Sequence, residues 1–245
     1  MVRHRNALWW VHLGTLATVV LWAAVDLQFE PMMGQLESLL VSPLAAVDAA
    51  TAHVGWQRPA GLIVLLALAM ITMTGICLRF VMRSTQGARS VSLQTLLSIT
   101  AIAALWFAIA NHHRWVAWQG KRIRMVTQID QLESIASPLR IDWPLRDGNL
   151  AEMGPFMAYP FGRPTTLILL QSPAVAGNGV CVSAVERSPA GAIKLQLVGD
   201  QSSDWAEWHP ESSCPQSFVG GLADQHDLVS ALSLGRGWYL VRYDA

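Results

Sequence analysis

Three apolar stretches decide the architecture of this chain: Ala7–Val25 (ALWWVHLGTLATVVLWAAV), Ala60–Leu78 (AGLIVLLALAMITMTGICL) and Val91–Ala110 (VSLQTLLSITAIAALWFAIA). Each is about 20 residues long, which as a helix spans the roughly 30 Å hydrocarbon core of a bilayer. The sequence therefore predicts three transmembrane helices within a membrane region at residues 1–113. The lipid bilayer is its first expected partner.

The first stretch has features of a secretory signal peptide, because Arg3 and Arg5 precede it. Small residues that a signal peptidase would accept lie at its end, at Ala23 and Ala24, and beyond it, at Ala45 and Ala46. The apolar region of a signal peptide is usually only about 7–15 residues long. Ala7–Val25 exceeds that length, which favours an uncleaved transmembrane helix.

The placement of charge predicts the orientation, because basic residues near the ends of spans tend to stay in the cytoplasm. Basic residues precede the first span (Arg3 and Arg5) and separate the second from the third (Arg79, Arg83 and Arg89). The loop at 26–59 is mainly acidic, with Asp26, Glu30, Glu37 and Asp48 against Arg58. We expect a multi-pass protein of the cell membrane with a cytoplasmic amino terminus and an extracytoplasmic carboxy-terminal domain. Arg114, Lys121, Arg122 and Arg124, after the third span, argue the other way.

Two segments outside the spans show helical periodicity. In the loop at 26–59, apolar residues recur at spacings of three and four: Leu36, Leu39, Leu40, Leu44 and Val47. This pattern predicts a short amphipathic helix, and the alternative is an irregular loop. After the third span, a similar stripe predicts a juxtamembrane helix at 114–138 that continues the span and ends near Ser137, before Pro138.

The remainder, 139–245, is predicted to be a small α+β domain with an antiparallel sheet. The predicted strands are Leu139–Trp143, Thr165–Gln171, Gly179–Arg187, Ala192–Val198 and Gly237–Tyr243. Ser188–Gly191 (SPAG) has turn chemistry, so the strands on either side of it should form a hairpin. Leu228–Leu234 is interpreted as a short helix, and the proline-rich Leu145–Pro164 as an extended surface crossing.

Charge and motifs exclude several classes of function. Residues 1–120 carry a net charge of +3 and residues 121–245 carry −3. Neither part has the clustered basic face of a nucleic-acid-binding protein. The chain contains no P-loop, GxGxxG, GxSxG or HExxH motif. We expect no cofactor.

Two cysteines in the domain, Cys181 and Cys214, are candidates for a disulfide, because the domain is expected in an oxidising compartment. Two separate thiols are the alternative. Cys77, inside the second span, is interpreted as a small packing residue.

The segment Asp204–Cys214 gathers groups that bind metals or protons, and its candidate polar cluster is Asp204, Glu207, His209 and Glu211. The spacing lacks the repeated His or Cys pairs of a zinc site, so an acidic surface loop explains it more simply. We assign no catalytic residue and no metal ligand.

Two polar positions lie in or next to the spans. His12 is inside the first span, where ionisable groups are costly and often functional. We interpret it as a neutral side chain that bonds to a neighbouring helix or reaches the interface. The run Asn111–Arg114 is interpreted as an interfacial anchor at the end of the third span.

The sequence favours a non-catalytic function, in which a membrane-anchored domain serves binding, assembly or sensing. One alternative is a membrane-anchored, metal-assisted hydrolase that uses His209 and Glu211. Another is an accessory subunit of a membrane complex, with other membrane proteins as partners.

Overall fold

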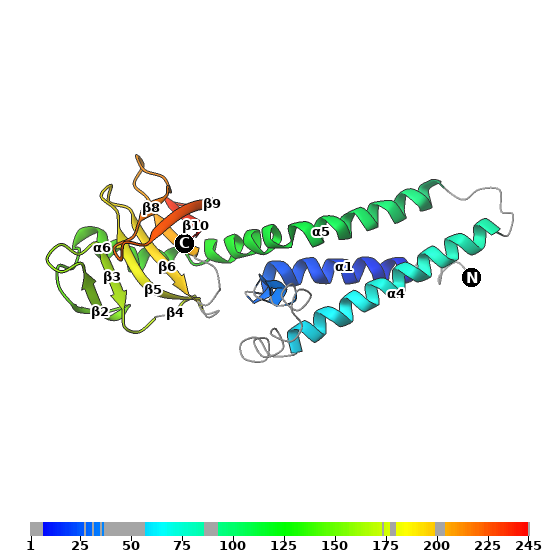
Figure 1. The fold of residues 1–245 in the computed structure, drawn as a ribbon, viewed down its shortest axis with the longest axis horizontal. Helices are drawn as coiled ribbons and strands as arrows, with labels where there is room; N and C mark the ends of the chain where they lie inside the picture. The colour runs from blue at the N-terminus through cyan, green and yellow to red at the C-terminus, as the bar shows by residue number, and fades with distance from the viewer. Residues whose placement is uncertain are drawn as a thin grey trace. The chain divides into compact units, whose positions relative to one another are not determined.

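The computed structural model describes residues 7–26, 28–30, 32–34, 36, 57–85, 93–172, 174–176, 180–198 and 204–244 (Figure 1). The chain divides into two compact units, Met1–Lys121 and Arg122–Ala245. The amphipathic helix predicted over Leu36–Val47 lies outside the described residues, apart from Leu36, which is helical.

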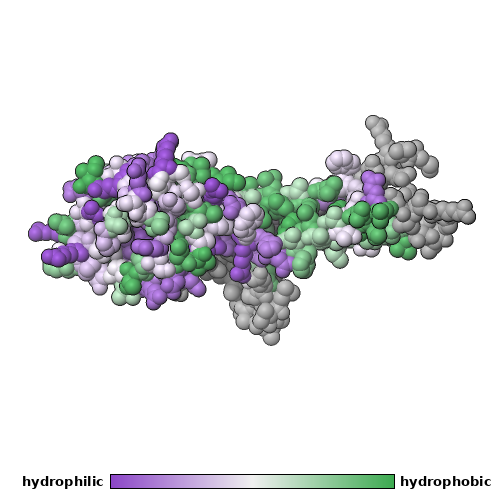
Figure 2. All heavy atoms as spheres, turned by 90° about the horizontal axis from the view of Figure 1, so that it is seen from above, coloured by the Kyte–Doolittle hydropathy of each residue, from purple (hydrophilic) through white to green (hydrophobic). Residues whose placement is uncertain are grey.

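Among the described residues, three long helices begin in the first unit: α1 (Ala7–Val25), α4 (Gln57–Thr85) and α5 (Leu93–Val126), whose last five residues belong to the second unit. Phe29, Glu30, Met32–Gly34 and Leu36 are also helical. Each of α1, α4 and α5 is long and apolar enough to cross a membrane, over Ala7–Val25, Gln57–Met82 and Leu93–Val126. The face of the helices shown in Figure 2 is mostly apolar, whereas the second unit has a mixed surface. The three predicted spans are therefore helices, and α4 and α5 are longer than their apolar cores.

Helices α1 and α4 run antiparallel, and their contacts fix the register. His12 lies against Thr72, and the indole of Trp22 lies against Gly61, where an added Cβ would be 3.2 Å from the ring. At the far end, Asp26 pairs with Arg58 at 3.4 Å and also accepts a hydrogen bond from the Trp22 indole.

Helix α5 runs parallel to α1 and packs closely against its second half. Val19, Ala23 and Ala117 belong to one buried apolar cluster, together with Leu62 of α4. One turn further, a Cβ on Gly120 would overlap the carbonyl group of Ala24 and lie 2.6 Å from its Cα. Only glycine permits this approach of the two backbones.

The predicted juxtamembrane helix is corrected in two respects. Helix α5 ends at Val126, and a separate helix, α6 (Ile129–Ile141), follows. The hydroxyl of Thr127 donates to the Arg124 carbonyl at 2.7 Å, which competes with the helical hydrogen bonds there. Pro138 does not end α6, because Ala136 and Leu139 on either side of it are buried and stabilise the helix by packing.

In its described residues, the second unit combines α6 with ten strands: β1 (Gly148–Leu150), β2 (Gly154–Tyr159), β3 (Thr166–Leu169), β4 (Ala174–Ala176), β5 (Val180–Arg187), β6 (Ile193–Val198), β7 (Asp204–Trp208), β8 (Phe218–Val219), β9 (Gln225–Gly235) and β10 (Trp238–Asp244). The strand order is β1-β2-β3-β5-β6-β7-β10-β9-β8, and β4 pairs with β5. All pairings among the described strands are antiparallel. The predicted α+β class and the β5–β6 hairpin are confirmed.

Three of the finer predictions are wrong. Leu139–Trp143 is the end of α6 and a loop, and Leu145–Pro164 contains β1 and β2. Leu228–Leu234 belongs to β9, not to a helix. The leucines at 228, 232 and 234 fit the two-residue period of a strand as well as a helix, and pairing of β9 with β10 decides between them.

One face of the sheet is apolar and packs on α6. Residues in register across five strands form a buried row on this face: Leu167, Val185, Leu195, Ala206 and Leu240. Helix α6 buries Leu132, Ile135, Ala136 and Leu139. Trp238 Nε1 donates to Glu133 of α6 at 3.0 Å, so the helix and this face share a polar contact at their edge.

Candidate functional site

The neighbouring row of residues, on the opposite face of the sheet, is polar and largely buried. Register places five side chains side by side across the strands: Thr166 (β3), Glu186 (β5), Lys194 (β6), Glu207 (β7) and Tyr239 (β10). Successive residues of a strand point to opposite faces, so this polar row alternates with the apolar row against α6. We call these residues, together with His209, His226 and Tyr243, the polar cluster.

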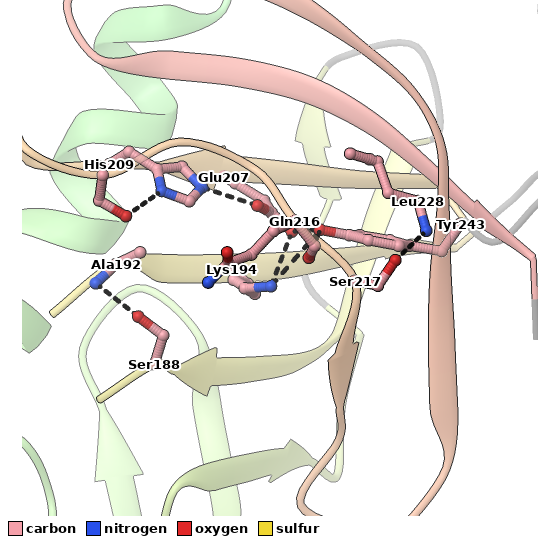
Figure 3. Close-up of polar contacts among 10 residues, drawn as sticks. Ser188, Ala192, Lys194, Glu207, His209, Gln216, Ser217, Leu228 and Tyr243 are labelled. Carbon is pink, nitrogen blue, oxygen red and sulfur yellow. Dashed lines mark hydrogen bonds and ion pairs between the residues drawn. The ribbon is translucent and has the colours of Figure 1, made fainter. Parts of the chain in front are cut away.

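Glu207 is the centre of the polar cluster and is fully buried, with 0% exposure. Its carboxylate accepts a hydrogen bond from the Tyr243 hydroxyl at 2.7 Å and lies 2.8 Å from His209 Nε2 (Figure 3). Lys194 Nζ is 3.4 Å from the same carboxylate. The three partners come from β6, β10 and the segment after β7, so the fold and not the local sequence assembles them.

Lys194 is a buried ammonium group with 4% exposure and an aromatic surrounding. Its Nζ lies 3.2 Å from the centroid of the Phe218 ring and 3.4 Å from the Tyr243 hydroxyl. Burial lowers the pKa of Lys194, and the nearby Glu207 opposes this effect. Burial, reinforced by Glu207, raises the pKa of Tyr243, so this phenol stays protonated and donates.

Glu186 forms the second acidic position of the polar cluster. It accepts hydrogen bonds from the Gly221 backbone N–H at 3.1 Å and from the Thr166 hydroxyl at 3.3 Å. Burial raises the pKa of Glu186, and Asp224 adds to this effect, while the Gly221 hydrogen bond opposes it.

The segment from His209 to His226 covers the polar cluster. His209 Nδ1 lies 2.9 Å from the Ser213 hydroxyl, which holds the start of the segment. His226 Nε2 lies 2.7 Å from Asp224, and its ring stacks on Phe218 at 4.8 Å between centroids. Trp205 and Tyr243 surround this ring pair with edge-to-face contacts. The cover is therefore an aromatic layer over charged groups.

The candidate residues Asp204, Glu207, His209 and Glu211 are only partly brought together. Glu207 and His209 are in contact, but Asp204 faces the other side of the sheet and binds Arg242 at 2.7 Å. An odd separation along a strand explains why Asp204 and Glu207 point in opposite directions. Glu211 is exposed in the turn after β7.

The candidates chosen from the sequence did not include six members of the polar cluster: Thr166, Glu186, Lys194, His226, Tyr239 and Tyr243. The available signal was a charged residue inside an apolar strand, as in Ile193–Val198 (IKLQLV). Within the part of the chain that the structure describes, no group of three or more His, Cys, Asp and Glu side chains is placed to hold a metal ion. The cluster is held together by hydrogen bonds and an ion pair within the chain.

The expected disulfide between Cys181 and Cys214 is not formed. The structure describes all three cysteines of the chain, and none is in a disulfide. Cys181 pairs in register with Val198, at the end of the sheet where β7 begins. Cys214 is exposed in the segment that leaves β7 at its other end, so chain spacing alone was a poor guide to proximity.

His12 lies at the junction of the three helices of the first unit and is fully buried. The Trp106 indole donates to His12 Nε2 at 2.9 Å, and His12 Nδ1 is 2.8 Å from the Thr72 hydroxyl. Because an indole N–H only donates, Nε2 must be the acceptor, and the proton of a neutral His12 is on Nδ1. The predicted helix-bonded His12 is confirmed, with both partners inside the chain.

No protein-family model, curated protein or solved structure matches this chain.

The raised pKa of Glu186 predicts how the stability of the second unit depends on pH. As pH rises above about 4.3, the unfolded chain loses this proton before the folded chain does, so stability falls up to the folded pKa. We expect Glu186→Gln to gain stability relative to the wild type between about pH 4 and about pH 7. Urea unfolding of the full-length protein in detergent micelles, with Glu211→Gln as the exposed control, measures the difference. If the free energies of unfolding of Glu186→Gln and the wild type differed by the same amount at both pH values, the prediction would be contradicted.

Proposed function

We propose that this chain is an integral membrane protein that carries a non-catalytic α+β domain on the extracytoplasmic side, for binding or assembly. Three helices of sufficient length and hydropathy support insertion. The basic segments before α1 and between α4 and α5 support a cytoplasmic amino terminus, and an odd number of spans then places the domain outside.

The sealed polar cluster is the observation that carries the non-catalytic part of this proposal. Glu207, Lys194 and His209 are all buried, and each is engaged by other groups of the chain. A catalytic acid, base or nucleophile must reach a substrate atom at hydrogen-bond distance. These side chains instead bond to one another beneath Phe218 and Ser213, which is the arrangement of a structural core.

A metal-assisted hydrolase has less support. Its two candidate groups lie in different environments: His209 is buried against Glu207, whereas Glu211 is exposed to solvent. A hydrolytic metal would need several ligands converging on one open position.

Cys214 offers a direct test of sidedness, because its thiol is exposed in the domain. We expect a membrane-impermeant maleimide to label the wild-type protein on intact cells, and Cys214→Ser to abolish most of the labelling. The variant retains Cys77 and Cys181 and is therefore the matched control. Labelling that appears only after the cells are permeabilised would place the domain in the cytoplasm.

The binding role is tested by recovering partners with the full-length protein from membranes in mild detergent. We expect a reproducible partner with the wild type and with Glu211→Ala, an exposed substitution. Recovery should fall at least tenfold with Glu207→Ala, which removes the centre of the polar cluster while leaving the helices unchanged. Equal recovery by all three proteins would show that the domain does not bind the partner.

A further inference from the structure

Ser213 is the partly exposed end of a series of hydrogen-bonding groups that begins inside the polar cluster. Its hydroxyl lies 2.9 Å from His209 Nδ1, and His209 Nε2 lies 2.8 Å from the Glu207 carboxylate (Figure 3). Glu207 and His209 are 0% and 5% exposed, whereas Ser213 is partly open to solvent. A hydroxyl, an imidazole and a carboxylate therefore follow one another from the surface to the interior.

The surroundings of Glu207 decide which nitrogen of His209 carries the proton. Glu207 accepts a hydrogen bond from the Tyr243 hydroxyl at 2.7 Å and lies 3.4 Å from the Lys194 ammonium, so it acts as an acceptor toward its neighbours. Because a carboxylate only accepts hydrogen bonds, a neutral His209 carries its proton on Nε2. Nδ1 then has a free lone pair, which accepts the hydrogen bond of the Ser213 hydroxyl.

The imidazole and the hydroxyl are held in place by the backbone around them. The His209 N–H donates to the Gly237 carbonyl at 2.8 Å, and the Tyr239 ring meets the imidazole edge to face at 5.6 Å between centroids. Gly237 has a φ of +81°, and a Cβ there would lie 2.7 Å from the His209 carbonyl oxygen, so glycine permits this approach. The Ser213 N–H donates to the Pro210 carbonyl at 2.9 Å, which closes its turn. Both groups are therefore positioned before a ligand arrives.

This arrangement is the one that makes a serine nucleophilic. A serine hydroxyl is a weak nucleophile until a base accepts its proton, and the base works best when a third group orients it. His209 is placed as the base, and Glu207 is placed to orient it. A serine that only closed a turn would not need a buried carboxylate behind its histidine.

We propose that Ser213 is a nucleophilic serine that binds an acyl ester covalently, with His209 as general base and Glu207 as a positioning residue. Ser213 Oγ forms a bond to the carbonyl carbon of the ester, and its proton passes to His209 Nδ1. The bond from that carbon to the alcohol oxygen breaks, and the same proton leaves with the alcohol. The products are an acylated Ser213 and a free alcohol, with His209 neutral again and Glu207 ionised throughout.

The inference goes beyond the proposed function and does not depend on membrane insertion or on sidedness. Among the buried groups, only His209 Nδ1 takes part, at the point where it already contacts Ser213 Oγ. One ester consumed per chain is a binding event without turnover. The domain thus gains a covalent way to hold a ligand.

The test treats the purified full-length protein in detergent micelles with a biotinylated fluorophosphonate, which bonds to nucleophilic serines as fluoride leaves. We expect one adduct per chain, located at Ser213 by peptide mass spectrometry. Ser213→Ala should lose the labelling, whereas Ser212→Ala, a change to the exposed neighbouring serine, should keep the wild-type rate. Prior treatment with p-nitrophenyl acetate should block the labelling and release one nitrophenol per chain.

Two variants of His209 distinguish its role as a base from a structural role. His209→Asn keeps an amide near the position of Nδ1, and His209→Gln keeps one near the position of Nε2, but neither amide takes up a proton. Both should slow the labelling by about 10²-fold or more. Hydrogen exchange in peptides from β7 and β10 establishes that each variant is folded.

Three results would overturn the proposal: an unlabelled wild type, labelling at a serine other than Ser213, or a folded His209 variant that is labelled at the wild-type rate. Nitrophenol release that continues well beyond one equivalent would also overturn it, because the acyl group would not be held. If both His209 variants unfold, the comparison of Ser213→Ala with Ser212→Ala still decides.

Discussion

Replacement of Glu207 by alanine should destabilise the second unit by about 3–5 kcal/mol, because it leaves the buried ammonium of Lys194 without its counter-charge. The substitution also removes the acceptor of the Tyr243 hydroxyl and the partner of His209. Urea unfolding of the full-length protein in detergent micelles measures the loss. Hydrogen exchange in peptides from β6, β7 and β10 locates it.

Two further variants distinguish the effect of an unpaired buried charge from the effect of losing the side chain. Glu211→Ala removes the same side chain from an exposed turn, so we expect a change within about 0.5 kcal/mol. The double variant Glu207→Gln with Lys194→Met removes both charges and keeps an acceptor for Tyr243. It should be more stable than Glu207→Ala alone, because no buried charge remains unpaired. If the double variant were as unstable as Glu207→Ala, the lost ion pair would not be the main cause of the destabilisation.

Gly120→Ala should weaken the packing of α5 on α1 by roughly 1–3 kcal/mol, through overpacking. The added Cβ would overlap the carbonyl group of Ala24, and backbone cannot move aside as a flexible side chain can. The usual gain in helix propensity from glycine to alanine, about 1 kcal/mol, acts in the opposite direction and is smaller. Thermal unfolding of the purified protein in detergent micelles measures the net loss.

Gly14→Ala is the matched control in α1. Among the described residues, no atom outside the neighbouring turns of α1 lies within 4 Å of the position that a Cβ would take there, so we expect helix propensity to be the main change. We expect stability to stay the same or to rise by up to about 1 kcal/mol. Equal effects of the two substitutions would show that the close approach of Gly120 and Ala24 is not formed in the protein.

The polar cluster has a cost that bears on the proposed function. Buried ion pairs often contribute little net stability compared with apolar residues of the same shape. We interpret Glu186, Lys194 and Glu207 as groups that fix the register of five strands and hold the cover segment in place. A domain that serves as a docking module needs this kind of fixed shape.

The sequence was sufficient to predict an element wherever consecutive residues of that element carry the whole pattern. The length and hydropathy of Ala7–Val25 fix a membrane-length helix, because both properties belong to consecutive residues. Strands β3, β5 and β6 were also predictable, since a β-rich run bounded by turn residues is a local property. The α+β class follows from the order of these elements.

Only the tertiary structure decided which residues meet. Strand pairing brings Lys194 and Tyr243 to Glu207 and turns Asp204 away, because register and strand direction depend on segments far apart in the sequence. Packing likewise sets Trp106 of α5 beside His12 and Gly120 beside Ala24, although these residues lie far apart in the sequence. The local sequence predicted the three spans and strands β3, β5, β6 and β10, but it missed β1, β2 and β7 and assigned part of β9 to a helix. Register between elements, which no single segment encodes, determined the polar cluster.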